Sequence, residues 1–77
     1  MSKLKIIDAK QMEKLLFMLD FKRIRQKGSH VFYKHPDGRY TTIPHHKNRV
    51  LARPLIKEIL REIKINIDEY NDLISDL

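Results

Sequence analysis

The chain has 77 residues, enough for one domain with a thin hydrophobic core. It contains no cysteine, which excludes disulfides, thiolate nucleophiles and cysteine-based zinc sites. No apolar run approaches the roughly 18 residues needed to span a bilayer, so we expect no membrane partner. The first residues lack an apolar signal core, which favours a cytoplasmic location.

The net charge of +6 is unevenly distributed along the chain. Residues 21–57 carry ten basic side chains and a single acid, whereas residues 68–77 carry four acids and no base. A basic middle segment favours a polyanion such as RNA as a partner, although an ordinary solvated basic surface has the same composition. The ten basic residues are Lys22, Arg23, Arg25, Lys27, Lys34, Arg39, Lys47, Arg49, Arg53 and Lys57.

The first periodic segment predicts a helix over about residues 8–19. Its apolar side chains follow the i, i+3, i+4, i+7 spacing of one helical face. Asp8 and Gln11 form a capping-box pattern at its start, and Asp20 is expected to end it because aspartate tolerates the left-handed conformation. The predicted core residues of this helix are Met12, Leu15, Leu16 and Leu19, together with Phe17 and Met18, which broaden the apolar face.

The next part of the chain predicts an antiparallel sheet. A turn at Gly28-Ser29 joins the first two strands, and the segment His35-Pro36-Asp37-Gly38-Arg39 predicts a tight hairpin before the third. Ile24 is the clearest inward residue of the first strand, and Pro44 stops the third strand because it cannot donate to the ladder. We expect the three strands at residues 21–27, 30–34 and 40–43.

Two further helices follow a loop at residues 45–52. The first begins near Pro54, a residue favoured in the first turn, and carries an apolar stripe from Leu55 to Ile63. Residues 66–69 repeat the capping-box signature and predict a short acidic helix over about residues 67–77. Its apolar residues recur at helical spacing, so we expect this helix to pack within the chain.

The order helix, three strands, helix, helix predicts a single α+β domain over residues 1–77. Its two layers are a three-stranded antiparallel sheet and helices that cover one face of it. The core of the domain is expected over about residues 8–64, with the C-terminal helix added at residues 67–77.

Four histidines between residues 30 and 46 are the side chains that titrate naturally near neutrality. His30 begins the second strand, and His45 and His46 follow the third strand. In a three-stranded meander these positions fall near the same end of the sheet. His35 belongs at the opposite, hairpin end, so we do not expect it to be catalytic.

Metal-independent RNA cleavage requires few protein groups. A base removes the 2′-hydroxyl proton, an acid protonates the leaving 5′-oxygen, and cations or amides stabilise the charged phosphorane. His30 is the candidate base, and His45 or His46 is the candidate acid. The glycine turn before His30 can present N–H groups to a phosphate. The supporting or phosphate-binding residues are expected to be Arg25, Lys27, Gly28, Ser29, His45 and His46.

The same residues allow other interpretations. A strand histidine with only a surface role is the structural alternative for His30. Metal binding is disfavoured because adjacent histidines in an extended segment point to different sides, so we predict no metal and no cofactor. Passive RNA binding is the third possibility, since strand aromatics can stack on bases, although on a small sheet they are more often core. These aromatics are Phe32, Tyr33 and Tyr40.

Three linked motifs at compatible spacing resemble the HicA family, the small toxins of type II toxin–antitoxin pairs. The resemblance covers residues 8 to about 64 without interruption. The motifs are Arg25-Gln26-Lys27-Gly28-Ser29-His30, His35-Pro36-Asp37-Gly38-Arg39 and Ile43-Pro44-His45-His46.

The resemblance implies a fold like that of the double-stranded-RNA-binding domain and ribosome-independent cleavage of messenger RNA, which arrests translation. His30 falls on the catalytic histidine of the family, and Gly28 and Ser29 fall on the residues before it. An antitoxin partner, HicB, is implied to cover His30 in a hetero-oligomer. A non-catalytic RNA-binding module or a regulatory partner protein is the alternative function.

The sequence also departs from the family pattern at the ends of helices. Family members often have glycine at the positions of Asp20 and Lys64. They commonly have Gly-Thr or a similar pair where this chain has Arg53-Pro54. These differences affect element boundaries rather than the Gly-Ser-His motif.

Overall fold

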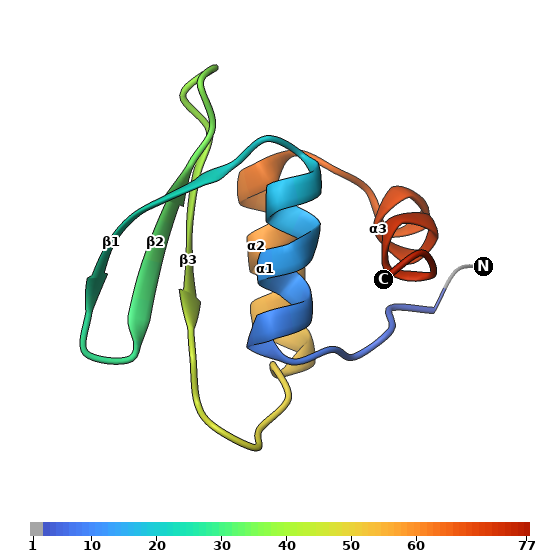
Figure 1. Cartoon of the computed structure of the whole chain (residues 1–77). Helices are drawn as coiled ribbons and strands as arrows, with labels where there is room; N and C mark the ends of the chain where they lie inside the picture. Colours follow the sequence, from blue (N-terminus) through green and yellow to red (C-terminus); the bar gives the residue numbers. More distant parts are fainter. Residues whose placement is uncertain (1–2) are drawn as a thin grey trace.

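The computed structural model describes residues 3–77, which form three helices and three strands in the predicted order (Figure 1). The α+β prediction is therefore confirmed. The last helix is shorter than predicted, because its regular part ends at Ile74. The elements are α1 (Ala9–Met18), β1 (Lys22–Lys27), β2 (His30–Lys34), β3 (Tyr40–Pro44), α2 (Arg53–Ile63) and α3 (Ile67–Ile74).

Both predicted capping boxes are present. At α1 the Asp8 carboxylate accepts the backbone N–H of Gln11 at 2.9 Å, and Gln11 Oε1 accepts that of Asp8 at 3.1 Å. Asn66 and Glu69 make the same pair of bonds at the start of α3. Each box satisfies two backbone donors that the helix itself cannot pair. Helix α2 has no side-chain cap, but Pro54 lies in its first turn, where a missing N–H costs nothing.

The sheet is an antiparallel meander in the order β1-β2-β3. His30 pairs with Lys27 on β1 and with Pro44 on β3, so the start of β2 lies between the ends of its two neighbours. At the other end of the sheet, the 35–39 hairpin closes with a bond from the His35 N–H to the Arg39 carbonyl at 2.8 Å. The predicted turns and pairings are confirmed.

The register of β1 shifts between Arg23 and Arg25, which leaves Ile24 at a bulge. The prediction that Ile24 points into the core is wrong, because its side chain is 49% exposed. The bulge interrupts the alternation on which that prediction was based. In addition, β1 is the outer strand and diverges from the helices along its length (Figure 1).

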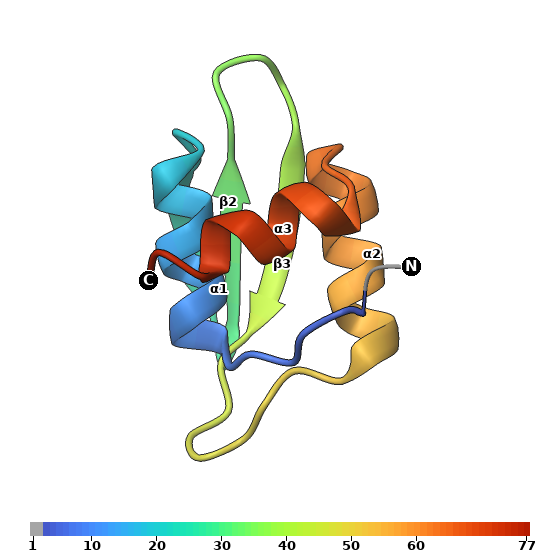
Figure 2. The same cartoon turned by 90° about the vertical axis from the view of Figure 1, so that its right-hand side faces the viewer.

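The helices lie on one side of the sheet in two tiers. Helices α1 and α2 pack side by side against it, and α3 crosses them on the side away from the sheet (Figure 2). Tyr70 of α3 is fully buried, and its hydroxyl donates to the Lys5 carbonyl. The Asn71 side chain donates to the Lys3 carbonyl at 2.7 Å. The expectation that the C-terminal helix packs within the chain is confirmed.

The core lies between the sheet and the helices. Val31, Tyr33 and Ile43 of the sheet are fully buried in one cluster with apolar residues of α1 and α2. Two residues that were expected in this core are instead on the surface: Phe17 is 48% exposed and Met18 is 45% exposed. The Phe17 ring packs edge-on against Tyr33 of the sheet, with the centroids 6.3 Å apart, but the residue stays half exposed.

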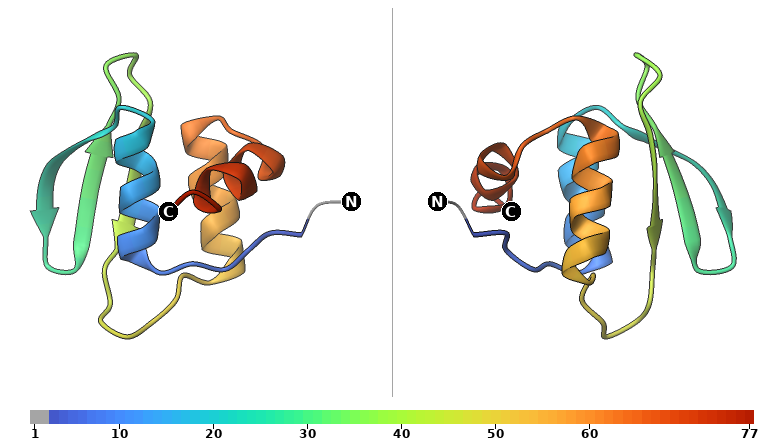
Figure 3. Two further views of the ribbon diagram at one scale, coloured as in Figure 1. Left: turned by 45° about the vertical axis from the view of Figure 1, so that its right-hand side comes forward. Right: turned by 180° about the vertical axis from the view of Figure 1, so that it is seen from behind.

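The opposite face of the sheet has no helix over it. Because side chains alternate along a strand, burial of Val31 and Tyr33 toward the helices turns His30, Phe32 and Lys34 to the other face. Within residues 3–77 no other segment covers that face, as the view from behind also shows (Figure 3). We call it the open face.

Candidate functional site

The turn between β1 and β2 is held by two hydrogen bonds outside the strand ladder. Gly28 has a φ of +59°, a left-handed conformation that favours glycine, and the Gln26 side chain donates to its carbonyl at 3.0 Å. The Ser29 carbonyl accepts the backbone N–H of His45 at 2.7 Å. A Cβ at Gly28 would meet no atom within 4 Å, so the turn is open to an approaching ligand. The backbone before His30 is therefore fixed but accessible.

His30 itself is exposed on the open face. No hydrogen bond or ion pair to the rest of residues 3–77 holds its imidazole. Its neighbour across β1 is Lys27, and the next pair on the same face is Arg25 and Phe32. Side chains that face each other across strands lie close together, so His30 has cations at its side. The cations can hold an anionic ligand beside His30, and the unbonded imidazole can then accept a proton from that ligand.

His45 lies at the same end of the sheet but on the helix side. Its Nε2 is 2.9 Å from the Tyr33 hydroxyl and 3.9 Å from Glu13 Oε2. Tyr33 in turn donates to Glu13, a residue of α1, and Arg23 of β1 lies 3.6 Å from the same carboxylate oxygen. Because the single hydroxyl proton of Tyr33 goes to Glu13, Nε2 of His45 carries a proton and donates to the Tyr33 oxygen. His45 thus joins α1 to the sheet.

The electrostatics of this network keep His45 neutral. Burial lowers the pKa of His45, and its proximity to Arg23 adds to the effect, while Glu13 and Asp8 oppose it. Burial and the hydrogen bond to Glu13 raise the pKa of Tyr33 above its ordinary value. Both groups are therefore uncharged near neutrality and serve as hydrogen-bonding partners.

The structure places the predicted site residues in two groups. Arg25 and Lys27 share the open face with His30, next to the turn formed by Gly28 and Ser29. His45 is brought to the same end of the sheet by its backbone, but its imidazole lies on the other face, so the two imidazoles do not meet. The second group, which faces the helices or the loop beyond them, consists of His45 and the exposed His46. His35 lies at the far hairpin, where its Nδ1 accepts the Asp37 N–H at 3.0 Å.

A groove of about 520 Å³ opens where the β3–α2 loop meets the start of α1. It contains both members of the His45-His46 pair and three cations, and Asn48 in its loop has a φ of +61°. Sequence reasoning did not single it out, because its two walls are separated by more than thirty residues of chain. Its lining consists of Asp8, Ala9, Lys10, His45, His46, Lys47, Asn48 and Arg49.

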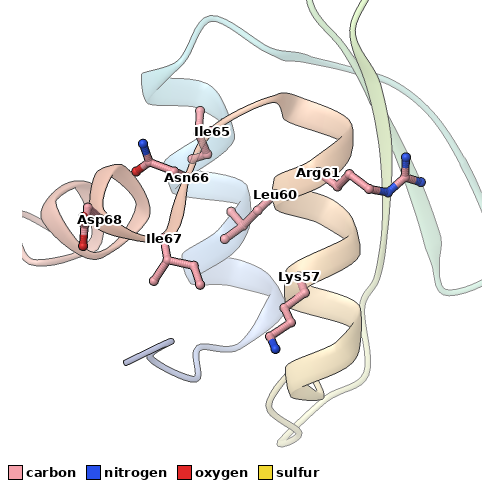
Figure 4. A pocket seen from close by; sticks show the side chains of 7 residues that line it. All are labelled: Lys57, Leu60, Arg61, Ile65, Asn66, Ile67 and Asp68. Atoms are coloured by element: carbon pink, nitrogen blue, oxygen red, sulfur yellow. The ribbon is translucent and has the colours of Figure 1, made fainter. Parts of the chain in front are cut away.

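A second hollow of about 590 Å³ lies between α2 and α3, remote from the sheet (Figure 4). Leu60 and Ile67 point into it, whereas Arg61 extends away from it and bonds Glu58. Its lining contains no histidine, and its charged members are Lys57, Arg61 and Asp68. In the described part of the chain, no group of three or more His, Cys, Asp or Glu side chains lies close enough to hold a metal ion.

Comparison with known families gives one match. Residues 9–65 match the model of the HicA toxin of bacterial toxin–antitoxin systems. The chain belongs to the HicA family. A search of curated proteins finds no match. HicA membership means that the protein is the toxin of a toxin–antitoxin pair and has an antitoxin partner. Among residues 3–77 no helix is long and apolar enough to cross a membrane.

The departures from the HicA pattern have a structural meaning. Asp20 and Lys64, which occupy positions where the family often has glycine, both adopt left-handed conformations, with φ of +69° and +60°. Each follows the last turn of a helix, where such a residue ends the helix and frees the chain to turn. The chain therefore reaches these left-handed conformations at two helix ends without glycine.

The Glu13–Tyr33–His45 network was not predicted from the sequence. The sequence alone groups Tyr33 with the other strand aromatics and gives no role to Glu13. The sequence does carry one signal. Alternate residues of a strand face the same side, so if Ile43 faces the helices, the position after Pro44 faces them too. Following that phase past the end of β3 would have separated His45 from His30.

Proposed function

We propose that this HicA toxin is a metal-independent endoribonuclease that uses His30 as general base and arrests translation by cutting messenger RNA. The observation that supports it most directly is the exposed, unbonded imidazole of His30 beside Lys27 on the open face. Messenger RNA is translated in the cytoplasm, so the toxin would act there.

The proposed reaction uses groups near the Gly28 turn and an acid from the loop between β3 and α2. His30 takes the proton of a 2′-hydroxyl, and the 2′-oxygen attacks the adjacent phosphorus. The bond from phosphorus to the 5′-oxygen then breaks, which leaves a cyclic phosphate and a 5′-hydroxyl. Lys27 and Arg25 stabilise the charged phosphorane, together with N–H groups of the turn. His46 remains the candidate acid, because the His45 imidazole is held by Tyr33 on the helix side.

The test is RNA cleavage by purified His30→Ala. This exposed side chain bonds nothing in residues 3–77, so its loss should change stability by less than about 0.5 kcal/mol. Cleavage and toxicity should be lost, whereas His35→Ala, which removes a histidine in the hairpin beyond the far end of the same strand, should still cut. Equal cleavage by His30→Ala and the parent would refute the assignment. EDTA should leave cleavage unchanged.

The antitoxin is proposed to inhibit by covering His30. Adding the purified antitoxin should then stop cleavage and also block alkylation of the His30 imidazole. Continued alkylation in an inhibited complex would show that the antitoxin acts elsewhere. The alternative function is a non-catalytic RNA-binding module, for which RNA would shift on a gel without ever becoming shorter. In both cases Lys27→Gln should reduce the salt dependence of RNA binding by about one ion.

A further inference from the structure

The open face carries a row of flat side chains that crosses all three strands. The Arg25 guanidinium of β1 lies over the Phe32 ring of β2, 4.6 Å from its centroid. The Tyr40 ring of β3 follows, with its centroid 6.1 Å from that of Phe32 and an angle of 36° between the rings. Arg25, Phe32 and Tyr40 form what we call the stacking row.

The exposure of the three strand aromatics separates this row from the core. Tyr33 is fully buried, as expected for a core residue, whereas Tyr40 is 43% exposed and Phe32 is partly exposed. An aromatic ring left partly in water on an uncovered sheet face retains a surface to which another flat group can bind. Arg25 covers part of the Phe32 ring, but guanidinium planes stack on bases as aromatic rings do. Arg25 therefore adds a stacking surface to the row.

The charge around the row has a single sign. Lys27 and Lys34 flank it on the same face, at the pairing positions of His30 and Tyr40. None of the strand segments 22–27, 30–34 and 40–44 contains an acid. A surface that combines stacking groups with cations alone matches a chain of bases joined by phosphates, and it matches an apolar or cationic protein surface poorly.

We propose that the open face binds single-stranded RNA, with successive bases stacked on Phe32 and Tyr40 and the phosphate backbone along Lys27 toward His30. This rests on the proposed function, because the bound strand is the one that His30 cleaves. A duplex does not fit, since its bases are stacked on each other and their faces are unavailable. The substrate class is therefore unpaired RNA.

The position of the row relative to His30 determines which bond is cut. His30 and Phe32 are two residues apart on one strand and point to the same face, which separates them by about 7 Å along the strand. A base stacked on Phe32 thus leaves a neighbouring ribose and phosphate within reach of the imidazole. The row selects the register of the RNA, and His30 acts on the nucleotide beside it.

The test measures binding without cleavage, in a His30→Ala background, by the anisotropy of a short fluorescein-labelled oligo-uridine. Phe32→Leu and Tyr40→Leu each remove a ring but keep an apolar strand residue, and each should weaken binding about tenfold, or about 1.4 kcal/mol. Tyr40→Phe keeps the ring and should therefore bind as tightly as the protein with Tyr40. Phe17→Leu is the matched control, because Phe17 is 48% exposed but lies on α1. This variant should bind oligo-uridine as tightly as the His30→Ala parent. Circular dichroism and urea midpoints identify any variant that does not fold.

Three results would overturn the proposal. The first is unchanged oligo-uridine affinity in Phe32→Leu and Tyr40→Leu, even if the parent cleaves RNA. The second is an RNA duplex that competes better than the single strand. The third is unchanged RNA affinity with weakened capture of the antitoxin, which would make the face a protein interface. If the ring variants weaken binding but no form of the protein cleaves RNA, the cleavage proposal fails and this one stands.

Discussion

His30 and His45 lie on opposite faces of the sheet, although the backbone N–H of His45 is bonded to the residue that precedes His30. One histidine is exposed beside cations, and the other is held between Tyr33 and Glu13. Because the His45 N–H bonds the Ser29 carbonyl, the network of Glu13, Tyr33 and His45 helps to fix the position of the turn before His30. We therefore expect the two residues to respond differently to substitution and to pH.

His45→Ala should weaken the fold and not the chemistry. The substitution removes the hydrogen bond to Tyr33 and part of the packing between α1 and the sheet, so the free energy of unfolding should fall by about 1–2 kcal/mol. Urea unfolding measures this loss. The cleavage rate per folded molecule should remain that of the parent at a temperature where both are folded. A large loss of rate in fully folded His45→Ala would indicate a direct role for its imidazole.

The stability of the protein should depend on pH through His45. Its pKa in the folded chain is lowered by burial from the ordinary value of 6.5, so the unfolded chain takes up a proton first as the pH falls. Stability should thus be greatest above pH 6.5 and decrease as the pH falls through that value toward the lower, folded pKa. Urea midpoints measured across this range test the sign. In His45→Ala this part of the pH dependence should disappear, and an unaltered profile would contradict the assignment.

Lys64→Gly should stabilise the protein. Lys64 ends α2 with a φ of +60°, a conformation that costs a residue with a Cβ roughly 1–2 kcal/mol and glycine almost nothing. Glycine also makes the unfolded chain more flexible, so the expected net gain is about 0.5–1 kcal/mol. Thermal and urea unfolding measure it. Lys64→Ala removes the same side chain and keeps the strain, so it should give no comparable gain.

Tyr70→Ala should be among the most damaging single substitutions. The match to the family ends at residue 65, yet Tyr70 of α3 is fully buried and its hydroxyl donates to the Lys5 carbonyl. Truncating a buried aromatic costs about 3–5 kcal/mol, a large part of the stability of a chain this size. Calorimetry should show a strongly lowered melting temperature. Tyr70→Phe keeps the ring and should lose only about 1 kcal/mol for the hydrogen bond. If α3 were a dispensable addition, both variants would melt like the parent.

Much of the fold could be predicted from the sequence because its signals are local. The capping boxes at Asp8 and Asn66, and the Pro-Asp-Gly turn before Arg39, each specify a boundary within four or five residues. The exposure of a helix flank, in contrast, depends on tertiary geometry. Phe17 continues the apolar stripe of α1, but the packing of that helix against the sheet and α3 leaves it 48% exposed.

The sequence predicts at which end of the sheet the candidate site lies, but not on which face each of its histidines lies. The meander order alone places His30 and His45 at one end of the sheet, and that prediction was correct. The face on which each imidazole lies depends on the phase of alternation, which turns His30 outward on β2 and continues past Pro44 to turn His45 toward the helices. The contacts of His45 with Tyr33 and Glu13 depend in addition on how α1 docks on the sheet, which no local pattern specifies.

The outer strand β1 has a further consequence for the protein in the cell. An uncovered edge strand exposes unpaired backbone groups and invites sheets of neighbouring molecules to join, and natural proteins counter this with charge and with bulges. Four of the six β1 residues are basic, and the strand is bulged at Ile24. Two of these charges, Arg25 and Lys27, are also those proposed to bind RNA, so they serve to keep copies of the toxin apart as well. Neutralising them to disarm the protein would at the same time remove its protection against aggregation.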